Sequence, residues 1–169
     1  MEERRARFEE LYRQHVKAVA AYALRRAPRE TAEDVVAETF LVAWRRLEQV
    51  PAQPLPWLYG VARRTLANYR RSATRRQSLA DRLRLEVRVI PQEPADERLR
   101  DALQTLRAGD RELLMLVAWE GLRPSEVARV LECSPVACRI RLHRARRRLA
   151  DALEVPAHSA SGLRTKEAK

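Results

Sequence analysis

The chain is poor in the residues that build metal, redox or phosphate-binding sites. Its only cysteines are Cys133 and Cys138, and its three histidines are scattered, so no ligand set has the spacing of a zinc site. Its four glycines form no phosphate-binding loop. A free thiol on a core stripe behaves as a small apolar side chain. We therefore predict packing roles for both cysteines, and a protein with no metal, no cofactor and no catalytic activity.

Long apolar runs are also missing. No stretch approaches the length of a membrane span, and the amino terminus begins Met1-Glu2-Glu3-Arg4-Arg5, without an apolar signal core. We therefore expect a soluble, cytoplasmic protein. Scarce glycine and few β-branched runs, in a chain that is 46% hydrophobic, favour an all-α fold.

Acidic residues are absent where basic residues are densest. The chain carries a formal charge of +11, and residues 133–150 contain six arginines and no acid. An ordinary solvated helix face is the alternative, but such faces usually mix charges of both signs. Unmixed arginines repel one another unless phosphate neutralises them, so this segment favours a nucleic-acid partner.

The same segment has the pattern of a helix–turn–helix unit. Ser134 is a suitable N-cap and Pro135 suits the first helical position. The expected inward stripe consists of Cys138, Leu142, Ala145 and Leu149. A second helix of this kind fits the major groove. The candidate duplex contacts are Ser134, Val136, Ala137, Arg139, Ile140, His143, Arg144 and Arg147.

The remainder of the chain predicts a helical bundle and a connecting segment. Apolar spacing indicates helices over 8–22, over 31–47 with Thr31 as its cap, and over 55–69, with Pro51, Pro54 and Pro56 in a loop. A further helix is expected from Leu99 to Trp119, ended by Gly121. The predicted organisation is a bundle domain (1–76), a flexible linker (77–96), a helix–turn–helix domain (97–153) and a disordered tail (154–169). The sequence leaves open whether the two small domains are compact or extended relative to each other.

The third predicted helix has its own arginine face. Arg63, Arg64, Arg70 and Arg71 lie within about a third of the helical wheel, and Trp57 and Tyr59 stand just upstream. Positive charge beside aromatic rings suits single-stranded nucleic acid, whose bases stack on the rings. Solvated arginines and an ordinary core tryptophan remain the alternatives.

The second predicted helix has a different surface. Opposite its apolar arc lie Asp34, Glu38, Leu41 and Arg45. A leucine ringed by acids is a poor DNA surface and a suitable protein-docking surface. A single exposed leucine would mean little, but beside two nucleic-acid surfaces it indicates a protein partner.

These segments together resemble the extracytoplasmic-function (ECF) sigma factors of bacterial RNA polymerase, over about residues 5–152. Residues 32–40, AEDVVAETF, are similar to the segment that docks on the polymerase clamp helices. Residues 57–64, WLYGVARR, are similar to the minus-ten recognition and melting segment. Glu126-Val127-Ala128 with 141–146, RLHRAR, resembles the helix–turn–helix that binds the minus-thirty-five element.

The resemblance implies an initiation factor that docks on core polymerase, melts the minus-ten element and binds the upstream duplex. It also implies that Asn68 contacts the minus-ten element together with the arginines of the third predicted helix. It also implies an anti-sigma partner. The chain departs from the family pattern in both domains. In the first domain, Ala37 stands where the family usually has glutamine, and Arg64 and Asn68 stand where asparagine and aspartate are usual. In the second domain, Glu132 stands where glycine is frequent, and residues 136–139, VACR, stand where the family often has GTVK. These departures affect promoter sequence more than function.

Two other functions are consistent with parts of the sequence. A stand-alone helix–turn–helix transcriptional regulator would explain the carboxyl-terminal half but not the face around Trp57 or the surface around Leu41. An enzyme acting on nucleic acid would need paired metal ligands, and the docking helix offers only Asp34 and Glu38.

Overall fold

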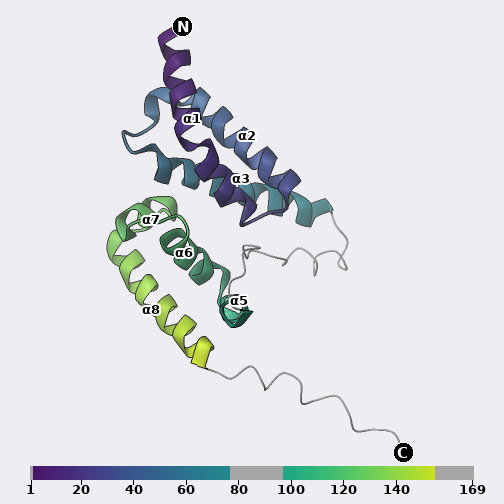
Figure 1. The fold of residues 1–169 in the computed structure, drawn as a ribbon, viewed down its shortest axis with the longest axis vertical. Helices are drawn as coiled ribbons and strands as arrows, with labels where there is room; N and C mark the ends of the chain where they lie inside the picture. The colour runs from purple at the N-terminus through teal and green to yellow at the C-terminus, as the bar shows by residue number, and fades with distance from the viewer. Residues whose placement is uncertain (1, 77–96, 155–169) are drawn as a thin grey trace, which may run out of the picture.

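The computed structural model describes residues 2–76 and 97–154, and every regular element within them is helical, as the sequence predicts (Figure 1). The predicted linker and tail lie outside the described residues, apart from Glu154, which ends the last helix instead of beginning the tail. The elements are α1 (Glu2–Leu24), α2 (Arg29–Arg45), the short 3₁₀ helix η1 (Leu47–Gln49), α3 (Pro54–Arg76), α5 (Glu97–Thr105), α6 (Ala108–Ala118), α7 (Pro124–Val130) and α8 (Pro135–Glu154).

The first three helices form a bundle in which each helix packs on the other two. Their apolar stripes meet in a core whose fully buried members include Val19, Val35 and Leu58. On the outer side of this core, the ring of Phe8 meets that of Trp44 edge to face, with 5.2 Å between their centroids. The aromatic contact holds α1 and α2 together and leaves the other side of α2 to solvent.

The last four helices form the second domain, in which α8 packs on α5, α6 and α7. The helix predicted from Leu99 to Trp119 is in fact two helices, because the chain turns at Leu106 and Arg107 between α5 and α6. Gly121 lies in the turn after α6 with a φ of +65°, a left-handed conformation that glycine adopts without strain.

Two other local predictions are wrong. Helix α2 begins at Arg29, with Pro28 as its N-cap, so Thr31 lies inside the first turn and does not cap it. Pro54 and Pro56 belong to the first turn of α3 and not to the preceding loop. Proline is tolerated there because the first backbone N–H groups of a helix have no partner within the helix.

The two domains pack directly against each other, which the sequence left open. Figure 1 shows α7 lying beside α3, and the buried apolar residues of both domains form one continuous cluster. A Cβ atom added at Gly60 of α3 would lie 4.0 Å from the Cα atom of Val130 in α7. A small residue at this position lets the two helix backbones approach closely.

Candidate polymerase and nucleic-acid interfaces

Helix α8 is half buried and half exposed, as its pattern predicts. The Ala137 N–H donates to Ser134 Oγ at 3.1 Å, which confirms the predicted N-cap. Cys138 and Leu142 are buried against the domain core, while Val136 is 56% exposed and Ile140 is 48% exposed. Ala137 is half-buried, and the other exposed side chains of the predicted contact set are Ser134, Arg139, His143, Arg144 and Arg147. The outward face is therefore a small apolar patch surrounded by positive charge.

The basic face of α3 also lies at the surface. The predicted contacts Arg64, Asn68, Arg70 and Arg71 are exposed, and Arg63 is half-buried. Arg71 donates a hydrogen bond to the Asn68 side chain one turn away. Arg70 Nη2 donates to the Arg26 carbonyl oxygen at 3.0 Å, so this guanidinium is tied to the α1–α2 turn. The face consequently combines one anchored arginine with neighbours that reach solvent.

The two aromatic residues predicted beside this face lie differently. Trp57 is half-buried and packs on the apolar core. Tyr59 is only 3% exposed, and its ring stacks on Tyr22 with 4.9 Å between centroids. Burial, reinforced by the negative charge of Glu120, raises the pKa of Tyr59 to about 12. In this arrangement the Tyr59 ring is covered, although the sequence predicts that it faces a DNA strand.

The predicted docking surface of α2 is exposed. Asp34 and Arg45 reach solvent, Glu38 is half-exposed, and Leu41 is 41% exposed, whereas the neighbouring Phe40 is buried. Tyr69 of α3 lies next to these acids: burial, then the charge of Asp34 and a hydrogen bond to it, raise the pKa of Tyr69. The surface is thus an acidic strip with a leucine at its centre, bordered by the end of α3.

The segments that carry these surfaces match two sequence families, one in each domain. Residues 11–76 match Sigma-70 region 2, and residues 96–149 match Sigma-70, region 4. The chain is also 34% identical over 149 residues to the ECF RNA polymerase sigma factor SigL of Mycobacterium tuberculosis, which covers 82% of this chain and 84% of SigL. The chain belongs to the ECF sigma factors. Members of this family are transcription initiation factors without catalytic activity of their own.

Other relatives agree with this assignment. This sigma factor is 36% identical over 127 residues to the probable RNA polymerase sigma factor RfaY of Xanthomonas campestris. The match covers 68% of this chain but only 32% of RfaY, so this chain spans about a third of that relative. Its fold is similar to that of the sigma factor RpoE of Bartonella quintana, solved with the anti-sigma factor NepR (TM-score 0.68, 24% identity, 88% of this chain and 97% of that chain). CnrH, solved with the cytosolic domain of CnrY, gives a TM-score of 0.59 at 30% identity, with 86% of each chain covered.

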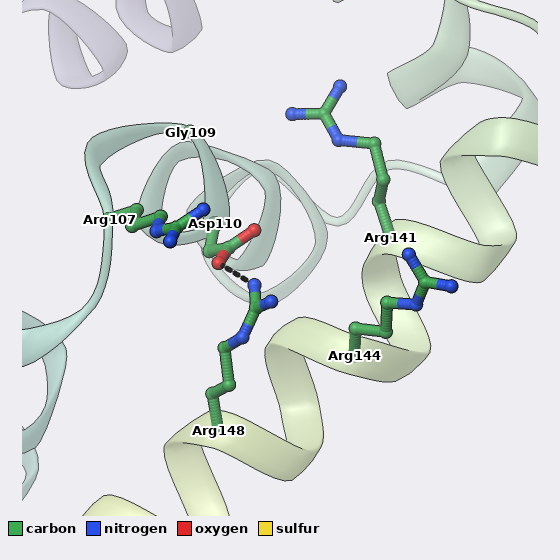
Figure 2. A pocket seen from close by; sticks show the side chains of 6 residues that line it. All are labelled: Arg107, Gly109, Asp110, Arg141, Arg144 and Arg148. Carbon is green, nitrogen blue, oxygen red and sulfur yellow. Dashed lines mark hydrogen bonds and ion pairs between the residues drawn. The ribbon is translucent and has the colours of Figure 1, made fainter.

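A basic hollow in the second domain of the sigma factor was not predicted from the sequence. Figure 2 shows Arg148 of α8 paired with Asp110 of α6, while Arg107, Arg141 and Arg144 line the same hollow. A Cβ atom at Gly109 would lie 3.4 Å from Arg141 Nη2, so glycine leaves room for that guanidinium. One carboxylate faces four arginines, which gives the hollow a strong positive potential next to the outward face of α8.

The described residues form neither a metal site nor a disulfide. Within 2–76 and 97–154, no group of three or more His, Cys, Asp or Glu side chains is arranged to hold a metal ion. Cys133 and Cys138 are both free thiols, and Cys138 is fully buried among apolar neighbours. No helix in the described part of the chain is long and apolar enough to cross a membrane.

Proposed function

We propose that this ECF sigma factor divides promoter recognition among three surfaces. Helix α2 docks on core RNA polymerase through Asp34, Glu38, Leu41 and Arg45. Helix α3 holds the opened minus-ten strand, with Arg63, Arg64, Asn68, Arg70 and Arg71 on its backbone and Trp57 and Tyr59 shaping the site for its bases. Helix α8 binds the minus-thirty-five duplex through its outward face.

The observation that best supports this division is the chemistry of the exposed faces. The α2 face is acidic with a central leucine, the α3 face is basic, and the α8 face is apolar at its centre and basic at its edge. Protein, single strand and duplex are the respective partners that such faces suit. The basic hollow lined by Arg107, Arg141 and Arg144 would extend the duplex contact to a flanking phosphate.

The two DNA surfaces would act as a bivalent binder. Each surface alone makes few contacts, and attachment of both to one polymerase raises the effective concentration of the second once the first is bound. The sigma factor RpoE of Bartonella quintana, which has a similar fold, has been solved with the anti-sigma factor NepR. We propose that this chain too is held by an anti-sigma partner and that it works in the cytoplasm, where the polymerase is.

Run-off transcription with purified core polymerase on genomic fragments tests the proposal. We expect discrete transcripts that require both the polymerase and this chain. A pull-down with core polymerase separates the proposal from a stand-alone helix–turn–helix regulator, because the regulator would bind DNA without retaining core. DNA binding with no core binding and no transcript would overturn the proposed function.

A further inference from the structure

The contact between the two domains contains a buried charged cluster. Arg26, in the turn after α1, has a side chain that is only 2% exposed. Its Nε donates to the Glu112 carboxylate at 2.9 Å and its Nη1 donates to the Glu120 carboxylate at 2.7 Å. Both glutamates belong to the second domain, in α6 and just after it. A guanidinium of the first domain is therefore enclosed by two carboxylates of the second.

Neighbouring groups complete this cluster. Arg25 Nη1 donates to the other oxygen of Glu120 at 2.9 Å, and the Tyr22 hydroxyl donates to Glu112 at 3.0 Å. The Arg26 guanidinium lies 3.7 Å from the centroid of the Tyr22 ring. Two arginines balance two glutamates, and the Glu120 side chain is 1% exposed. Removing one member of such a cluster leaves an uncompensated buried charge, so each member strongly favours the closed contact while the others are present.

The same contact covers part of the proposed minus-ten surface. Gly60 lies against the backbone of Val130 in α7, and the charge of Glu120, just after α6, acts on the neighbouring Tyr59. Arg64 forms an ion pair with Glu132, in the turn between α7 and α8. Glu132 has a φ of +54°, a left-handed conformation that disfavours residues other than glycine. The second domain thus pairs with one arginine of the proposed minus-ten surface and packs on α3 at Gly60, within the same surface.

The duplex-binding surface is not covered in this way. Val136 and Ile140 stay 56% and 48% exposed while the domains are in contact. Arg139, Arg144 and Arg147 are exposed as well. The closed arrangement is consequently asymmetric, because it engages the part of the α3 surface at Gly60 and Arg64 and leaves the α8 surface open.

From this asymmetry we infer that the free chain is a closed form in which the second domain competes with the minus-ten strand for α3. The inference rests on the proposed function of α3. In the closed form the protein binds upstream duplex but binds single-stranded minus-ten DNA poorly. Core polymerase, or any partner that separates the domains, uncovers α3. The apparent affinity for the strand is the affinity of the open form multiplied by the fraction of molecules that are open.

Two substitutions of opposite charge test this inference in the full-length chain. Arg26→Gln removes a positive charge and Glu120→Gln removes a negative one, so a simple charge effect on DNA binding would move their affinities in opposite directions. Domain opening predicts instead that both variants bind a labelled minus-ten single strand about tenfold more tightly or better. Their affinity for a minus-thirty-five duplex should not change. Both probes come from a promoter identified by run-off transcription and are measured by fluorescence anisotropy.

Small-angle X-ray scattering gives a readout that needs no DNA. The wild-type chain should be compact, and both variants should have a larger radius of gyration, with helix content by circular dichroism unchanged. Arg13→Gln is the matched control, because its ion pair with Glu10 lies within α1 and is exposed. It should behave as wild type.

The outcomes separate the two claims. An extended wild-type chain, or two variants as compact as wild type with unchanged strand affinity, would overturn the closed form. If both variants expand but no form binds the strand, the proposed role of α3 fails, and with it the competition, while the closed form stands. Opposite affinity shifts for the two variants would show an effect of charge alone and would also overturn the competition.

Discussion

Val136 and Ile140 are the two apolar side chains that the outward face of α8 offers to a DNA groove. Near the start of a helix lying in the major groove, a small apolar side chain contacts the methyl group of thymine. We predict that Val136→Thr changes the preference at one upstream base pair by about 1–3 kcal/mol at most. Arg147→Ala, which removes an exposed charge, should weaken all sites alike.

Selection from a randomised upstream element checks this pair of variants. The Val136 variant should select a motif that differs at one position, and the Arg147 variant should select the wild-type motif at lower affinity. An unchanged motif for Val136→Thr would show that this side chain does not contact a base.

Glu132 combines backbone strain with an exposed ion pair. Its φ is +54°, and its partner Arg64 is 50% exposed, so the pair contributes little to stability. Glu132→Gly should therefore raise the free energy of unfolding by about 0.5–1 kcal/mol, because glycine adopts this conformation without a Cβ clash.

Urea denaturation measures the effect of that substitution. Glu132→Gln is the control, since it removes the ion pair and keeps the strain, and it should be no more stable than wild type. If the glycine variant were clearly less stable than wild type, the ion pair would outweigh the strain, contrary to this account.

At the scale of the helix, the sequence predicts correctly the features that depend only on neighbouring residues. The start of α8 follows from Ser134 and Pro135, whose effects act within one turn. The start of α2 was missed because Thr31 is a good cap in isolation, whereas the chain enters that helix at Pro28. The turn at Leu106 was missed because the apolar period continues across it: Leu103, Leu106 and Leu113 all reach the same core.

Helix α2 makes the simplest prediction about the polymerase. Leu41→Glu combined with Glu38→Arg changes the centre of the docking surface and leaves the buried Phe40 and Val35 untouched. We expect at least tenfold weaker binding to core polymerase, measured by fluorescence titration, with an unchanged circular dichroism spectrum. Glu9→Arg is the control, since Glu9 is exposed on α1 and lies outside the predicted docking segment. Normal core binding by the double variant would refute the assignment.

Helix α3 makes a prediction about salt. Replacing Arg64 and Arg71 by glutamine removes two charges from its exposed face. Each phosphate contact on a single strand contributes roughly 0.7 to the slope of log affinity against log salt. The slope for the open complex should fall by about 1.4 if both arginines contact phosphate, while minus-thirty-five duplex binding by the same variant should not change. Permanganate footprinting should show reduced melting; a normal footprint would argue against this role.

At the scale of the molecule, the amphipathic patterns and charge runs predicted both domains and the three exposed surfaces. They did not predict how the domains meet. Arg25 and Arg26 do not stand out in a chain whose 34 basic residues include only three lysines. Glu112 and Glu120 become recognisable only once α6 is placed beside the end of α1. Contacts between residues about ninety positions apart leave no periodic trace in a single sequence, and neither does the stacking of Tyr59 of α3 on Tyr22 of α1.

The shared interface predicts how the protein melts. One apolar cluster runs through both domains and encloses the ion pairs of Arg26, so unfolding of one domain should remove stability from the other. We expect a single calorimetric transition for the wild-type chain. For Arg26→Gln we expect two transitions, or one that is broader and lower in temperature. Two well-separated transitions in wild type would contradict this coupling.

The cluster around Arg26 also restricts how the halves of such proteins can be exchanged. A hybrid that joins residues 2–76 to the carboxyl-terminal half of a relative keeps the arginines but receives whatever the donor has at the positions of Glu112 and Glu120. Where the donor lacks the two acids, the hybrid should remain permanently open and should capture single strands without polymerase. The two halves are therefore expected to be inherited as a matched pair, even though each touches its own part of the promoter.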